Sequence, residues 1–247
     1  MITSIFEQFE IIRLIPIHPF GNLDLSFTNS SLYLVIALFI LNGLINNNIK
    51  NLVPGRWQSV IEILYENIVG VVKDNIGSAG FKYFPFLFSL FLLILVLNIV
   101  GIVPYTFTPT AHIIVAFGLS LSIWFACIIL SLQNFRLNFF AMFMPVGAPM
   151  FLAPFLVLIE LVSFAAKAIT LGVRLGANLT AGHLIFAIVA GSTWKILTAG
   201  GLLTLASVFP LFILVFITVL EIAVALIQAY VFCLLTTSYL NDTIHLH

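Results

Sequence analysis

The sequence has 247 residues, of which 62% are hydrophobic and only 7% are charged, and its formal net charge is zero. Because soluble domains carry about 25% charged residues, this composition excludes a water-exposed globular domain and predicts a protein of the lipid bilayer. The balanced charge, without any basic run, also argues against a nucleic-acid partner.

Residues 1–26 precede the first apolar run and show no targeting signal. Glu7 and Glu10 stand where a secretory signal would be basic, and the segment lacks the Arg- and Ser-rich, acid-poor composition of a transit peptide. We therefore expect a bacterial protein or one that is made inside an organelle.

Three apolar segments have the length of an ordinary transmembrane helix. A hydrocarbon core about 30 Å thick requires about 20 helical residues to cross it. The segments run from Phe27 to Ile45, where "NNN" follows, from Phe84 to Val103, and from His112 to Leu132. We expect one membrane-spanning helix from each of them.

Residues 54–77 differ from these spans because they are amphipathic. Between Arg56 and Asn75, apolar residues recur at helical spacing on one side, and the charged residues fall mostly on the other. This pattern predicts a helix that lies on the membrane surface. A helix packed on a soluble partner subunit is equally compatible with it.

Residues 150–240 break the pattern of ordinary spans. Two apolar runs, Met150 to Gly191 and Leu202 to Leu240, are separated by "STWKILTAGG". Each run of about 40 residues would be roughly 60 Å long as one helix, twice the thickness of the hydrocarbon core. Either each run holds two short spans or each is one steeply tilted helix. The lack of turn signals favours a long tilted helical hairpin, with Pro210 bending its second helix.

Basic residues predict the orientation of these segments. They cluster between the first and second spans, which by the positive-inside rule places that region in the cytoplasm or the mitochondrial matrix. Five crossings then put the C-terminus on the same side and the N-terminus on the other. Without an internal repeat or a linker, we expect a single membrane domain over residues 1–247, all-α and polytopic. The basic residues are Lys50, Arg56, Lys73 and Lys82.

The first helix of the predicted hairpin carries a polar stripe. Glu160, Lys167 and Arg174 are spaced by seven residues, which returns each to within about 20° of the last around a helix. Asn178 falls on the same side. Ionisable residues inside a membrane cost about 2.5 to 3.5 kcal/mol each, and are functional hypotheses by default.

One antiparallel register of the hairpin pairs the polar residues of its two helices. It places Arg174 opposite Gln228. The same register places His183 opposite Glu221, with the turn at Gly200-Gly201. A histidine opposite a carboxylate is a candidate relay for protons, because both groups titrate near physiological pH in a suitable environment.

Most of these side chains also have a purely structural explanation. Lys167 can extend toward the lipid headgroups as readily as it can serve a proton path, and Glu160 can be its ion-pair partner. Asn178 and Gln228 can hydrogen-bond between helices, which is the commoner use of amides in membranes. His183 alone would more often be a satisfied core histidine.

Arg174 is the exception, because a guanidinium at that depth needs a negative partner. A row of small residues on the opposite side of the helix allows close packing there, so Arg174 is expected to face outward with Leu171, Ala177 and Ala181. An outward-facing buried charge indicates a partner protein that bears a carboxylate. The small row is Ala168, Gly172, Gly176 and Thr180.

The sequence resembles subunit a of the F-type ATP synthases, in its mitochondrial form, over essentially its whole length. The similarity is carried by "ITLGVRLGANLTAGHL" at 169–184, "LEIAVALIQAYVFCLLTTSYLNDTIHLH" at 220–247, "RWQSVIEILYENI" and "VPYTFTPTAH". The stretch around Arg174 is the most specific of these.

The resemblance implies a role for each polar residue of the hairpin. Members of this family hold a fixed arginine beside a rotating ring of c subunits, between two offset aqueous half-channels, and Arg174 matches that arginine. By the same resemblance, His183 and Glu221 line the half-channel open to the intermembrane space. Asn178 and Gln228 are expected to flank the arginine.

The resemblance further implies that Glu160 marks the matrix-side exit, with Lys167 a weaker candidate for the path. The expected protein is a non-catalytic, multi-pass subunit of the mitochondrial inner membrane. Its N-terminus would face the intermembrane space and its C-terminus the matrix. Its expected partners are the c ring, the peripheral stalk, other membrane-sector subunits and the lipid bilayer.

Two other classes of function remain open from the residues alone. A self-contained transporter or channel could bind an anionic substrate at Arg174, although such proteins usually show an inverted repeat. A haem-bearing subunit would need paired axial histidines, and only His112 and His183 lie at or in the spans. Cys127 and Cys233 lack metal-ligand spacing, so we expect no disulfide, metal site or cofactor.

Overall fold

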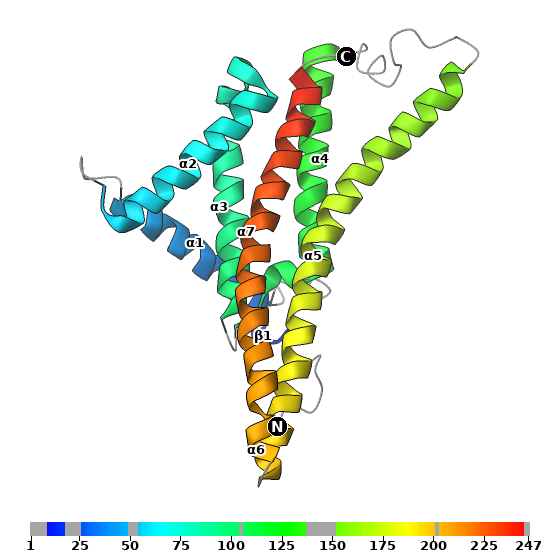
Figure 1. Cartoon of the computed structure of the whole chain (residues 1–247). Helices are drawn as coiled ribbons and strands as arrows, with labels where there is room; N and C mark the ends of the chain where they lie inside the picture. Colours follow the sequence, from blue (N-terminus) through cyan, green and yellow to red (C-terminus); the bar gives the residue numbers. More distant parts are fainter. Residues whose placement is uncertain are drawn as a thin grey trace. The chain divides into compact units, whose positions relative to one another are not determined.

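The computed structural model (Figure 1) describes residues 9–17, 26–48, 54–103, 106–136, 152–200 and 203–244. Glu7, Lys50 and Gly201 therefore lie outside the described residues. Helices dominate the described parts. A two-stranded antiparallel sheet joins β1 (Arg13–Ile15) to β2 (Phe27–Thr28).

The helices follow one another along the chain, with short 3-10 turns labelled η between some of them. They are α1 (Asn29–Asn48), α2 (Arg56–Asn75), η2 (Gly77–Lys82), α3 (Phe84–Ile102), η3 (Pro109–Ala111), α4 (Ile113–Phe135), α5 (Ala153–Ala199), α6 (Leu203–Ala206) and α7 (Val208–Ile244).

Four helical stretches among the described residues are long and apolar enough to cross a membrane: Phe84–Ile102, Ile113–Phe135, Pro154–Ala199 and Thr204–Ile244. The apolar part of α1, Asn29–Ile45, is shorter than these. The predicted all-α polytopic membrane fold is confirmed. The α1 helix continues through Asn46–Asn48, so "NNN" does not stop it where the sequence suggested.

The choice between two short spans and one long helix is decided for the first apolar run. The α5 helix is continuous over 47 residues. It also includes most of "STWKILTAGG", which had been expected to separate the two runs. The helix ends at Ala199, and Gly200 follows with a φ of 72°. Because this left-handed conformation favours glycine, the turn lies where Gly200 predicted it.

The second run is bent near its start, as Pro210 predicted, but the irregularity lies before the proline. The short α6 ends at Ala206, Ser207 forms a turn, and α7 begins at Val208. Proline lacks an N–H and its ring clashes with the carbonyl four residues earlier, here that of Ala206. The disturbance therefore falls one turn upstream, where the Ser207 hydroxyl donates to the Thr204 carbonyl at 2.6 Å.

The chain forms two compact units, each assembled from separate stretches. The first contains Met1–Leu44, Leu93–His112 and Leu175–Ala229, and the second contains Ile45–Leu92, Ile113–Arg174 and Tyr230–His247. The single domain expected over residues 1–247 stays a prediction.

In the second unit, α2 has the bounds that its periodicity predicted. Ile68, Val71 and Val72 are buried, and the Tyr65 ring packs edge-on at 4.8 Å from the Phe84 ring of α3. Near the other end of α2, Trp57 remains 69% exposed. Part of the apolar face of α2 is thus covered within the unit, and part is left for lipid or a partner.

The same unit shows why α5 carries small residues on one face. A Cβ added to Gly172 would lie 2.6 Å from the Ser120 Oγ and 3.1 Å from the Phe117 Cα of α4. Ala168 is also buried. The predicted row of small residues therefore permits close approach of α4 and α5 at this point.

Candidate functional site

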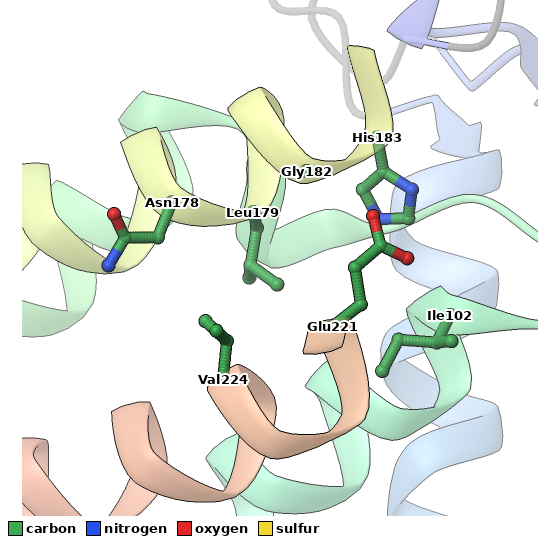
Figure 2. Close-up of a pocket in the computed structure, with 7 residues that line it drawn as sticks. All are labelled: Ile102, Asn178, Leu179, Gly182, His183, Glu221 and Val224. Atoms are coloured by element: carbon green, nitrogen blue, oxygen red, sulfur yellow. The ribbon is translucent and has the colours of Figure 1, made fainter. Parts of the chain in front are cut away.

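A small pocket in the first unit contains the predicted histidine–carboxylate pair. Asn178, Leu179, Gly182 and His183 of α5 line it from one side, Glu221 and Val224 of α7 from another, and Ile102 of α3 closes it (Figure 2). Its interior has room for about one water molecule. The predicted register between the two long helices is confirmed at His183 and Glu221.

Glu221 extends from α7 toward the backbone of α5 (Figure 2). A Cβ added to Gly182 would lie only 2.8 Å from the Glu221 Oε1, so glycine at this position makes room for the carboxylate. The same oxygen is buried and has no hydrogen-bond partner among the described residues. A buried carboxylate oxygen without a partner is costly, so this oxygen is a candidate to bind a water molecule in the pocket or a proton.

His183 also contacts residues that the sequence did not single out. Its Nε2 lies 3.1 Å from the Thr108 Oγ1, and the Phe9 ring packs edge-on against it at 6.4 Å. The Phe9 ring makes a similar contact with His112, which stacks at 5.0 Å on Phe107. Burial lowers the pKa of His112, which favours its neutral form.

The two amides have different surroundings. Gln228 is 8% exposed in the first unit, whereas Asn178 is exposed on α5 and also lines the pocket. Their expected place beside Arg174 stays a prediction, because Arg174 belongs to the second unit.

Arg174 lies on the exposed face of α5. Among the described residues it forms no salt bridge or side-chain hydrogen bond, but its charge interacts electrostatically with the buried Tyr239 of α7 in the same unit. Ala177 is exposed, as expected. Leu171 is not: it is only 2% exposed, on the buried face together with Ala168 and Gly172. The expectation that Leu171 shares the outer face was wrong, because it lies about 60° from Arg174 around the helix, on the side that packs inward.

The partner of Lys167 also differs from the one considered. Its Nζ lies 3.8 Å from the Asp242 Oδ2 of α7, within the second unit, while Glu160 is exposed on α5. Asp242 was missed because it sits near the end of the sequence, after the last apolar run, where a charged residue is unremarkable. The long reach of α7 brings it back to α5.

No group of three or more His, Cys, Asp or Glu residues in the described parts of the chain could hold a metal ion. Cys127 and Cys233 are buried free thiols.

Comparison with known proteins decides the family. The family model described as "ATP synthase A chain" matches residues 28–241. The chain belongs to the ATP synthase A chain family. It is 49% identical over 245 residues to ATP synthase subunit a of Metridium senile, which covers 99% of each protein. It is 46% identical to that of Chondrus crispus, over 100% of this chain and 98% of the relative, and 44% identical to that of Marchantia polymorpha, over 100% of both.

The resemblance read from the sequence is therefore confirmed. Arg174, His183 and Glu221 all fall inside the matched region, between residues 28 and 241. The second unit thus presents an exposed arginine on a long apolar helix, and the first unit holds a histidine and a carboxylate around one pocket.

Proposed function

We propose that this chain is the proton-conducting stator subunit in the membrane sector of an ATP synthase. It supplies two offset half-channels and presents Arg174 to the carboxylates of a rotating c-subunit ring, so that proton flow is coupled to ring rotation and ATP synthesis. The observation that carries this proposal is the exposed guanidinium on a long apolar helix of a chain that belongs to the ATP synthase A chain family.

The chemistry of arginine suits this role. With a pKa above about 12, Arg174 does not release its proton under cellular conditions. It attracts a ring carboxylate and favours the ionised form, yet it cannot pass protons directly between the half-channels. Protons must then travel on the ring. Each proton that crosses 100 mV supplies about 2.3 kcal/mol, so several ring sites are needed for each ATP.

His183 and Glu221 serve the half-channel open to the intermembrane space. The pocket they line has room for a water molecule, which can carry a proton between groups that do not touch. Asn178 and Gln228 flank Arg174 and orient the passing carboxylate. Glu160 marks the matrix-side exit.

Lys167 is a weaker candidate for the proton path than these residues. Its contact with Asp242 gives it a structural function that needs no role in conduction.

The chain is a non-catalytic, multi-pass subunit of the mitochondrial inner membrane, with its N-terminus toward the intermembrane space and its C-terminus in the matrix. The basic residues between the first two spans support this orientation. Its partners are the c ring, the peripheral stalk and other membrane-sector subunits. The described residues lack a three-ligand metal cluster, and the proposal requires no cofactor.

An experiment can distinguish this proposal from the alternative function, a self-contained transporter that binds an anionic substrate at Arg174. The purified chain in lipid vesicles is expected to conduct no protons above the background of empty vesicles, whereas vesicles with the assembled complex acidify when ATP is added. A quenched pH-sensitive dye reports both. Sustained, substrate-dependent transport by the chain alone would overturn the proposal and favour an anion site at Arg174.

Gly182 offers a specific test of the pocket. Gly182→Ala places a methyl group 2.8 Å from the Glu221 Oε1, so the carboxylate must shift while the helix stays intact. We expect ATP-driven pumping to fall roughly tenfold with normal assembly, because misplacing a reacting group by about 1 Å costs up to 100-fold. Gly191→Ala is the matched control, since a Cβ there meets nothing within 4 Å. Equal pumping rates in Gly182→Ala and Gly191→Ala would show that the position of the Glu221 carboxylate does not affect proton conduction.

A further inference from the structure

Thr108 joins the end of α3 to the histidine of the proposed proton path. It precedes η3, is 6% exposed, and belongs to the same unit as His183. Its Oγ1 lies 3.1 Å from the His183 Nε2 and 3.3 Å from the Gly101 carbonyl oxygen. One buried hydroxyl therefore bridges a titratable ring and a helix end.

The number of available hydrogens determines the direction of these two bonds. A threonine hydroxyl has one hydrogen to donate and can accept through its lone pairs, whereas a carbonyl oxygen can only accept. When the Thr108 hydroxyl donates to Gly101, its bond with His183 requires the ring to donate. The His183 Nε2 then carries a hydrogen, in the neutral ring as well as in the imidazolium.

The backbone of α3 is shaped to hold the hydroxyl in this place. A Cβ added to Gly101 would collide with the Thr108 Cγ2 and lie 2.7 Å from its Oγ1, so any larger residue would displace the threonine. Gly101 also lies in the last turn of α3, where carbonyl groups lack partners within the helix. A carbonyl at a helix end is a natural acceptor for such a hydroxyl.

We propose that Thr108 is a positioning residue of the proton path, which keeps the His183 Nε2 protonated so that the proton in transit is exchanged at Nδ1. This inference rests on the proposed function and deepens it. In the exchange, an imidazolium gives its Nδ1 proton to water, and water passes a proton on to the Glu221 carboxylate. The products are a neutral ring that retains its Nε2 hydrogen and a neutral carboxylic acid.

Two titratable groups of the first unit surround this histidine. Glu221 of α7 lines the same pocket, and the ring of His112, just before α4, contacts the same Phe9 ring as His183 does. Among the described residues, the Thr108 hydroxyl forms hydrogen bonds with His183 and Gly101 and with neither of these two groups. In histidine, the hydrogen bond made by one ring nitrogen sets the role of the other. With Nε2 bound to Thr108, Nδ1 is the nitrogen that remains to exchange protons.

Three substitutions in the assembled complex test the inference. Thr108→Val preserves the shape of the side chain and removes the hydroxyl, and we expect ATP-driven pumping to fall roughly tenfold. Thr108→Ser retains the hydroxyl and is expected to restore most of the rate. Thr106→Val is the matched control: its hydroxyl bonds the same helix end, at 2.7 Å from the Val100 carbonyl oxygen, without touching His183.

A double-mutant cycle separates positioning from a merely structural role. In a His183→Gln background, Thr108→Val is expected to cause no further loss, since both changes remove the same relay. If His183→Gln impairs pumping and Thr108→Val adds its full effect, the inference is wrong while the proposed path stands. If His183→Gln alone leaves pumping unchanged, the path proposed for His183 fails instead.

Nitrogen NMR of the wild-type complex gives a readout that does not depend on any variant folding. The complex is labelled with ¹⁵N-histidine, and the signal of His183 is identified because it is lost in the His183→Gln complex. For the neutral ring, we expect this signal to show a protonated Nε2 and an unprotonated Nδ1. The opposite tautomer would overturn the inference.

Discussion

Complexes that carry Arg174→Ala are expected to lose ATP-driven proton pumping, to a rate about 100-fold or more below that of the unmodified enzyme. Removing one partner of an ion pair in a low-dielectric site costs about 3 to 5 kcal/mol, and each 1.36 kcal/mol is a factor of ten in rate. Without the guanidinium, a ring carboxylate has no reason to stay ionised as it passes. The measurement is dye quenching in membrane vesicles, at matched amounts of assembled complex.

Two further variants make this result specific. Val173→Ala changes the neighbouring exposed residue of the same helix and is expected to pump normally. Arg174→Lys keeps a positive charge but loses the planar fork and the fixed protonation state, so an intermediate or severe loss is expected. Normal pumping by Arg174→Ala would show that the guanidinium has no essential role.

The second large effect is expected at Glu221. Glu221→Gln keeps the size of the side chain but cannot bind and release a proton, so proton conduction is expected to fall roughly 100-fold, within the range lost when a positioned acid or base is removed. The subunit is expected to assemble normally, because the buried Oε1 has no hydrogen-bond partner in the described structure to lose. Passive proton flux through the membrane sector, after removal of the catalytic sector, is the measurement.

The control for Glu221→Gln is the same substitution at a glutamate outside the proposed proton path. Glu62 lies on α2, and its Oε1 accepts a hydrogen bond from the Gln58 Nε2 at 2.9 Å. Glu62→Gln is expected to leave the flux unchanged. An unchanged flux in Glu221→Gln at several pH values would exclude Glu221 from the path.

Several parts of the fold could be predicted because they depend on simple lengths and periods. The thickness of a bilayer defines the length of α3 and α4, and a 3.6-residue period identified α2 to the residue. The register that brings His183 to Glu221 agreed with a turn at Gly200, because the position of the turn largely sets which residues of an antiparallel helix pair lie opposite each other.

The remaining parts depend on packing, which one sequence does not reveal. Thr108 and Phe9 approach His183 only through the path of the chain after α3 and before β1. The bond between Lys167 and Asp242 likewise joins residues far apart in the sequence. Leu171 was misplaced because a helical wheel gives angles but not the direction of the core, which lies to one side of the small-residue row.

The position of Arg174 against the ring is tested most directly by cross-linking. A photoreactive reagent attached to Ala177→Cys, on the exposed face one turn from Arg174, is expected to capture a c subunit. The same reagent at Leu171→Cys, whose native side chain is 2% exposed, is expected not to, and the native thiols Cys127 and Cys233 are too buried to react. Capture of the c subunit from position 177 alone agrees with an arginine that faces the ring. Failure of position 177 to capture any ring subunit in a fully assembled, active complex would contradict it.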